Sequence, residues 1–287
     1  MKKLFTISLL LFIISIFSCD QKLSTEASIC CDPSNVATAS FATFASDPEF
    51  VAEHESPLAL SREMEEGEMI SFATGDGEEA KAYLVKAAGE TKKYIFMIHE
   101  WWGLNDHIKK EAEKYATNLK DVHVLALDLY DGQLTSDPQE AGKIMQSVKA
   151  ERAEAIISGA LKYIGADASI ATIGWCFGGG WSLQSSIIAG ERSKACIIYY
   201  GMPEKDTERL KKLKAPVLGI FASQDKWINP GVVKEFVRNM KVAGNTLPEL
   251  KIYNADHAFA NPSNPKYQKV YADEAFELSR KFIQKNL

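Results

Sequence analysis

Short apolar runs alternate with longer amphipathic stretches over most of the chain. Each run is four to seven residues long and rich in β-branched or aromatic side chains, which is typical of buried strands. The predicted strands are Lys93–His99, Val122–Leu127, Ser169–Ile173, Ala195–Tyr200, Pro216–Ala222 and Leu250–Tyr253. Strands that alternate with helices indicate an α/β fold, in which a doubly wound, mainly parallel sheet carries helices on both faces.

The stretches between these runs repeat apolar residues with the period of a helix. The predicted helices are Asp106–Leu119, segments within 138–163, Trp181–Ala189, Val232–Val242 and Tyr267–Gln284. Ahead of the first run, Met69–Ala73 and Glu79–Val85 flank a Gly-Asp-Gly sequence, which predicts a β-hairpin. The whole pattern predicts one α/β domain over residues 66–287.

The first residues have the pattern of a bacterial export signal. Lys2 and Lys3 precede an apolar run, Leu4–Phe17, which is too short to span a bilayer comfortably. The run ends in Ser18-Cys19, which resembles a lipobox. This resemblance implies a signal peptide at 1–18, a lipid on Cys19 and an exported chain anchored to a bacterial membrane, periplasmic or on the outer surface. A plain secretory signal or a single N-terminal anchor is the alternative.

Residues 19–65 form a mixed stretch rich in Ser, Ala and Thr, which predicts a tether that becomes partly ordered. A short helical pattern follows Asp47, with Pro48 at its first position. This part is expected to pack on the domain or to carry a lid, with His54 at the surface. The sequence leaves open whether Cys30 and Cys31 are free, disulfide-bonded or metal-bound.

The stretch around Cys176 has the pattern of a nucleophile elbow. It follows a β-branched run and leads into a helical pattern, with glycines two residues before and two after the cysteine, at Gly174 and Gly178. Small residues there let the strand and the helix pass close together. A buried apolar cysteine is the alternative interpretation; it is the simplest one for Cys196, inside another apolar run.

Two downstream residues strengthen the interpretation of Cys176 as a nucleophile. Asp225 and His257 each follow a predicted strand, and an open α/β sheet places its ligand crevice at those strand ends. The order nucleophile, acid, histidine is that of α/β-hydrolases. His257 is suited to act as base and then as acid, while Asp225 holds the imidazole in one tautomer.

Several separated motifs together resemble the dienelactone hydrolase (carboxymethylenebutenolidase) family, an α/β-hydrolase family. These motifs are Ile98–Ile108, Asp128–Tyr130, Gly174–Gly179 and His257–Pro262. The resemblance implies hydrolysis of an ester or lactone through a thioester on Cys176. It also implies that Glu100 helps to generate the thiolate, and that the chain is a monomer. No metal or organic cofactor is expected.

The oxyanion is expected at the backbone amides of Trp101 and Phe177. Family members that act on dienelactone clamp its carboxylate with arginines, one of which corresponds to Asn261 here. Trp102, Tyr130 and Asn261 are the candidate pocket residues. The lack of an arginine at this position and the aromatic pair Trp101-Trp102 favour an acyl group more apolar or larger than a small anionic lactone.

The charge of the chain excludes one class of binding partner. The formal net charge is −5 with no basic stripe, which argues against nucleic acid. Two alternatives remain open from the sequence: a thioesterase or peptidase on the same fold, and a non-catalytic binding lipoprotein.

Overall fold

The computed structural model describes residues 37–60 and 66–287. The predicted signal peptide, the lipidation site Cys19 and the pair Cys30 and Cys31 lie outside the described residues. Within the described part of the chain, no helix is both long enough and apolar enough to cross a membrane.

The centre of the fold is one eight-stranded sheet with the strand order β1-β2-β4-β3-β5-β6-β7-β8. The strands are β1 (Gly67–Ala73), β2 (Glu79–Val85), β3 (Lys93–Ile98), β4 (His123–Leu127), β5 (Ser169–Trp175), β6 (Ser193–Tyr199), β7 (Val217–Ala222) and β8 (Glu249–Tyr253). The hairpin β1–β2 is antiparallel, and β2 also runs antiparallel to β4. The other neighbours are parallel, so the carboxyl ends of six strands share one edge.

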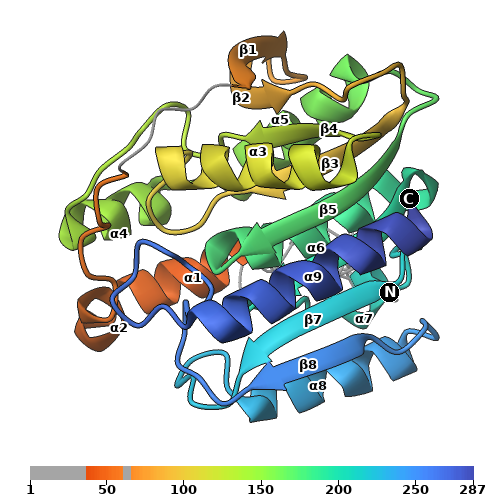
Figure 1. Cartoon of the computed structure of the whole chain (residues 1–287). Coiled ribbons are helices and arrows are strands. Elements are labelled where there is room, and N and C mark those ends of the chain that lie inside the picture. Colours follow the sequence, from red (N-terminus) through yellow and green to blue (C-terminus); the bar gives the residue numbers. More distant parts are fainter. Residues whose placement is uncertain (1–36, 61–65) are drawn as a thin grey trace, which may run out of the picture. The chain divides into compact units, whose positions relative to one another are not determined.

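Helices cover both faces of this sheet. They are α1 (Ala37–Ala45), α2 (Pro48–Ala52), α3 (Asp106–Leu119), α4 (Pro138–Ser147), α5 (Ala150–Tyr163), α6 (Phe177–Ala189), α7 (Thr207–Leu210), α8 (Pro230–Val242) and α9 (Lys269–Asn286), with a 3-10 turn, η2, at Gly190–Arg192. Figure 1 shows α3 and α9 in front of the strands and α5, α6 and α8 behind them. The predicted doubly wound, mainly parallel sheet is confirmed.

Most predicted elements agree with the structure, but α6 begins four residues before the predicted Trp181. Glycines at 178–180 have low helix propensity and hide the helical pattern there. They are required by close approach: a Cβ atom on Gly178 would lie 2.3 Å from the carbonyl oxygen of Ile98, and one on Gly179 would lie 2.7 Å from that of Tyr199. Tertiary packing therefore overrides the local preference.

Helix α1 was not predicted, because its Ala-, Ser- and Thr-rich sequence carries little periodic signal. It is stabilised by burial, since Phe41 is fully buried and contacts the ring of Phe177. Trp181 of α6 also donates a hydrogen bond from Nε1 to Oγ1 of Thr38, at 3.1 Å. The expected helix after Asp47 is confirmed as α2, and the Asp47 side chain caps it by accepting from the amide of Glu49.

Helices α1 and α2 lie at the edge of the sheet toward which β5 and β7 point (Figure 1). Phe50 of α2 is fully buried and packs against Trp101 and Trp227, with ring centroids 5.4 and 4.9 Å apart. Burying such a side chain contributes about 2 kcal/mol. Residues 37–60 are thus docked over the strand ends that carry the predicted site.

Candidate active site

Cys176 occupies a strained turn between β5 and α6. Its backbone angles, φ 54° and ψ −119°, lie where residues other than glycine are rare. The turn is possible because Gly174 and Gly178 touch: a Cβ atom on Gly174 would lie 2.0 Å from the carbonyl oxygen of Gly178. The predicted role of these glycines is therefore borne out by the packing, and the turn places Cys176 at the first turn of a buried helix.

Asp225 and His257 meet beside this turn. Nδ1 of His257 lies 2.6 Å from Oδ2 of Asp225, and both side chains are buried. The other carboxylate oxygen of Asp225 accepts from the amides of Trp227 and Ile228, each at 2.9 Å. Because a carboxylate only accepts, Nδ1 of His257 carries the proton, and this fixes the orientation of the ring.

The remaining ring nitrogen of His257 is unpaired. Nε2 is buried and makes no hydrogen bond within the described residues, yet it lies within 4.8 Å of the sulfur of Cys176. The structure therefore brings together three residues that are far apart in the sequence and arranges them in the order sulfur, imidazole, carboxylate.

The three groups influence one another's protonation. Burial raises the pKa of the Cys176 thiol, although His257 opposes this rise. Burial alone would lower the pKa of His257, but the carboxylate of Asp225 and the sulfur of Cys176 hold it well above its ordinary value. Burial also disfavours the charged form of Asp225, yet His257 and two backbone amides keep its pKa below the usual range. The arrangement favours an imidazolium next to Asp225 once the sulfur gives up its proton.

Glu100 lies two residues after the end of β3 and is 5% exposed. Its Oε1 accepts a hydrogen bond from Nδ2 of Asn261 at 2.5 Å, so the described conformation pairs it with Asn261 rather than with the Cys176 thiol. Burial raises the pKa of Glu100 to about 7, and the nearby His257 opposes this effect. A carboxyl group with such a pKa exchanges a proton near neutral pH.

The aromatic residues expected around the pocket are all buried. Trp101 is 0%, Trp102 3% and Tyr130 2% exposed. The hydroxyl of Tyr130 and Nε1 of Trp101 make no hydrogen bond within the described residues. The backbone amide of Phe177 faces the sulfur of Cys176 and favours its thiolate, as expected for the first amide of a helix.

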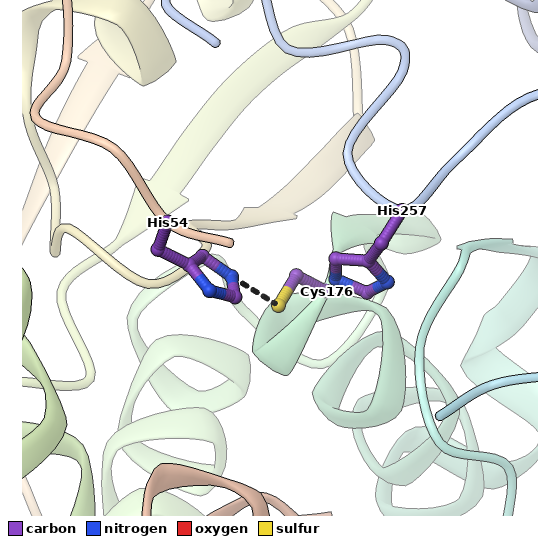
Figure 2. Close-up of side chains that lie close together, drawn as sticks. All are labelled: His54, Cys176 and His257. Carbon is purple, nitrogen blue, oxygen red and sulfur yellow. Dashed lines mark hydrogen bonds between the residues drawn. The ribbon is translucent and has the colours of Figure 1, made fainter. Parts of the chain in front are cut away.

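The expectation that His54 lies at the surface is wrong. His54 is 5% exposed, and its ring stacks on Trp101 with centroids 4.5 Å apart. Nε2 of His54 lies 4.0 Å from the sulfur of Cys176, and Figure 2 shows the rings of His54 and His257 on opposite sides of that sulfur. Phe50 and His54 are one helical turn apart, and this spacing was the sequence signal that His54 shares the buried face.

The tautomer of His54 follows from its second contact. Its Nδ1 lies 2.8 Å from the carbonyl oxygen of Phe50, which only accepts, so Nδ1 carries the proton and Nε2 presents its lone pair to the sulfur. Burial lowers the pKa of His54 to about 3, with the charge of His257 acting in the same direction. His54 is therefore neutral at ordinary pH.

Residues 37–60 close the site. The Cys176 side chain is 1% exposed, and a recess beside Glu100 and Asn261 has a volume of about 10 Å³, which is room for about one water molecule. Two ion pairs hold the segment in place, between Lys226 and Glu49 and between Lys266 and Glu53. Within this segment, Nε2 of His54 lies 4.0 Å from the sulfur of Cys176, so the segment covers one side of that sulfur.

The strand order and the elbow define an α/β-hydrolase. A family model described as "Dienelactone hydrolase family" matches residues 80–287. The chain belongs to the dienelactone hydrolase family and is a hydrolase, as the sequence motifs predicted.

Relatives of this chain extend over most of its length. A protein of Saccharolobus solfataricus described as "Putative carboxymethylenebutenolidase" is 27% identical over 75% of this chain and 97% of its own. "Protein usf" of Aquifex pyrophilus is 24% identical over 77% of this chain and 99% of its own. The crystal structure of a dienelactone hydrolase from Anabaena variabilis aligns with a TM-score of 0.56 at 19% identity, covering 77% of this chain and 98% of that one, and supports the fold.

Proposed function

We propose that this hydrolase cleaves esters or lactones with Cys176 as nucleophile, His257 as base and acid, and Asp225 as the group that orients His257. One observation carries the proposal: His257 is held by Asp225 at 2.6 Å, while its unpaired Nε2 lies within 4.8 Å of the elbow sulfur. A base that is oriented by a third group and lies next to a nucleophile is the arrangement that acyl transfer needs.

The reaction follows from these contacts. The thiol of Cys176 passes its proton to Nε2 of His257, and the sulfur attacks the carbonyl carbon. The amides of Phe177 and Trp101 stabilise the oxyanion. His257 then protonates the leaving oxygen, which leaves a thioester on Cys176. Water, deprotonated by His257, hydrolyses the thioester and restores the thiol.

The substrate class is inferred from the side chains that are expected to line the pocket. The proposed pocket offers Trp101, Trp102 and Tyr130, whereas Asn261 pairs with Glu100 instead of presenting a cation. This environment favours an uncharged ester or lactone with an apolar acyl group. Hydrophobic walls contribute about 1–3 kcal/mol of selectivity for each methylene of such a group.

A short-chain aryl ester tests the proposal. Wild-type protein is expected to give turnover and, when quenched early, a mass increase equal to one acyl group on the peptide that contains Cys176. Cys176→Ala is expected to lose both, whereas Cys196→Ala, which alters another buried thiol, is expected to keep both. Full turnover in Cys176→Ala, or an acyl group on another residue, would overturn the assignment.

We also propose that the chain is exported and anchored to a membrane through a lipid on Cys19. The pattern of Lys2, Lys3, the apolar run and Ser18-Cys19 supports this proposal. Metabolic labelling with a fatty acid is expected to mark the wild-type chain, and Cys19→Ala is expected to remain unlabelled. A chain that is unlabelled and soluble in both forms would contradict the anchor.

A further inference from the structure

We propose that Zn²⁺ binds between Nε2 of His54, Sγ of Cys176 and Nε2 of His257. These three atoms lie within 4.8 Å of one another, and all three residues are buried. They come from three separate parts of the chain: the segment after α2, the turn before α6 and the loop after β8. Figure 2 shows the sulfur between the two rings. The cluster therefore has the composition and convergence of a metal site.

The distances suit a small borderline-soft cation. Tetrahedral zinc binds sulfur at about 2.3 Å and imidazole nitrogen at about 2.0 Å, so neighbouring ligand atoms are separated by roughly 3.6 Å. The sulfur and Nε2 of His54 are 4.0 Å apart. Side-chain movements of less than about 1 Å would bring the three atoms to bonding distance of one ion. Three protein ligands leave the fourth position to water.

Both imidazoles are already oriented as ligands. Nδ1 of His54 donates to the carbonyl oxygen of Phe50, and Nδ1 of His257 donates to the carboxylate of Asp225. A carbonyl or carboxylate partner on the far nitrogen is typical of metal-bound histidine, because it fixes the tautomer and increases the basicity of the near nitrogen. Both rings are held so that a lone pair on Nε2 is directed toward Cys176.

An unsatisfied group provides the second line of evidence. Nε2 of His257 is buried without a hydrogen-bond partner among the described residues, although the side chain is only 6% exposed. Leaving such a group unpaired costs about 1–3 kcal/mol. The thiol has one proton to share between two imidazole lone pairs, so one lone pair stays unsatisfied. A cation satisfies both lone pairs and the sulfur together.

The charges balance on binding. As the Zn–S bond forms, Sγ of Cys176 and Nε2 of His257 both bind in their deprotonated forms, and the proton that this pair holds is released to solvent. The neutral imidazole of His54 binds without losing a proton. The thiolate and the carboxylate of Asp225 then offset the two positive charges of the ion. A buried cation is tolerated only with this kind of compensation.

Binding would tie residues 37–60 to the elbow. His54 would be bonded through the ion to Cys176, which strengthens the closed arrangement that Phe50 and the two surface ion pairs already favour. The ion would also occupy the sulfur and the base. If Cys176 is the nucleophile, as proposed above, the zinc-bound protein is inactive; the binding itself does not depend on that assignment.

Cobalt titration of the full chain tests the binding directly. Co²⁺ replaces Zn²⁺ in such sites and gives an intense sulfur-to-cobalt charge-transfer band. Reduced, chelator-treated protein is expected to bind one Co²⁺ per chain with this band, and added Zn²⁺ is expected to remove it. All proteins in this test carry Cys30→Ser and Cys31→Ser, so that these thiols do not contribute.

Single substitutions in this background identify the ligands. Cys176→Ser is expected to abolish the charge-transfer band, and His257→Gln and His54→Gln are each expected to weaken binding at least about tenfold. Glutamine keeps much of the volume of the imidazole, and His54→Ala provides a second variant at that position. Cys196→Ser and His107→Ala are the matched controls, expected to bind as the parent does. Thermal unfolding of each apoprotein identifies variants that fail to fold.

Two outcomes would overturn the site. One is a parent protein that shows no sulfur-to-cobalt band, or a band that survives Cys176→Ser. The other is unchanged affinity for Co²⁺ in both His54 variants, which would mean that Cys176 and His257 bind the metal without His54. Ester hydrolysis is measured separately: stoichiometric Zn²⁺ is expected to stop it and a chelator to restore it. Absence of hydrolysis in the metal-free protein counts against the proposed function and not against the metal site.

Discussion

The side-chain amide of Asn261 donates a hydrogen bond to Oε1 of Glu100, at 2.5 Å, inside the buried site. Asn261 is held in turn by Ser263, whose amide and hydroxyl both donate to Oδ1 of Asn261 at 2.8 Å. Asn261 can therefore present only its amide protons to Glu100. This neutral donor does not offset the charge of an ionised Glu100, and burial then has the largest effect on the protonation of Glu100, with His257 opposing it.

The stability of the protein is predicted to fall as the pH rises toward and through neutral. Glu100 has an ordinary pKa of 4.5, and burial raises it to about 7 in the folded chain. The folded state therefore binds more protons than the unfolded state between these values. The stabilisation is fully present below about pH 4.5 and is lost as the pH rises through about 7. At about 1.4 kcal/mol per pKa unit, the loss is about 3 kcal/mol.

Urea unfolding between pH 5 and pH 8 checks this prediction. Glu100→Gln keeps the acceptor for Asn261 but does not ionise, so its unfolding free energy is expected to depend less on pH than that of the wild type. Glu140→Gln, on the exposed surface of α4, is the matched control and is expected to keep the wild-type slope. Equal slopes for wild type and Glu100→Gln would mean that Glu100 ionises normally.

The contact between Gly174 and Gly178 is predicted to tolerate no side chain. Gly174→Ala places a Cβ atom 2.0 Å from the carbonyl oxygen of Gly178, and backbone on both sides prevents relief. We expect a loss of about 3 kcal/mol or more in unfolding free energy, or insoluble protein. Gly75→Ala, in the β1–β2 turn, meets nothing within 4 Å and serves as the control. A small effect at Gly174 would show that the turn is looser than described.

Removing the charge of Asp225 is predicted to impair the hydrolysis proposed here. Asp225→Asn no longer stabilises the imidazolium of His257 and is free to present an amide proton to Nδ1, which reverses the tautomer. We expect kcat/KM for an aryl ester to fall roughly 100-fold or more. Asp256→Asn, on the same loop as His257 but half-buried, is expected to stay within a factor of about 3 of wild type. A decrease as small in Asp225→Asn would remove Asp225 from the mechanism.

Local patterns in the sequence were sufficient to predict the sheet, the sharp turn at Cys176 and the position of Asp225 and His257 after strands. The apolar runs show where the strands end, and Asp225 and His257 each follow such a run. Cys176 is recognisable because close backbone contacts require glycine at 174 and 178. The resulting Gly-X-Cys-X-Gly pattern is visible in the sequence. These features depend on neighbours in the chain, so no tertiary information was needed.

The spacing of Phe50 and His54 indicates that they share one face, but the sequence does not show what that face packs against. His54 follows a five-residue helix, and its burial depends on Phe50 and Trp101, which meet only in the folded protein. The partner of Glu100 was missed for a similar reason: Asn261 is 161 residues away. Polar pairs that form across loops leave no periodic pattern, whereas strands and helices do.

Docking of Phe50 is predicted to control access to Cys176. Phe50→Ala removes ring contacts with Trp101, Trp227 and His54 and leaves a cavity under α2. Such a substitution weakens packing by about 3 kcal/mol, which would raise the population of the open segment by up to about 100-fold. We expect alkylation of Cys176 by iodoacetamide, followed by mass spectrometry, to become at least about tenfold faster.

Two internal references separate opening of the segment from unfolding of the domain. Cys196 is fully buried in β6 and is expected to react only when the domain unfolds. Phe72→Ala creates a comparable cavity on β1, where Phe72 packs against Tyr163 and not against the site. If Phe50→Ala accelerates labelling of Cys176 but not of Cys196, and Phe72→Ala accelerates neither, residues 37–60 act as a lid over the sulfur. Equal acceleration of Cys176 and Cys196 would instead mean that the segment and the domain unfold together, and access would then require loss of the fold.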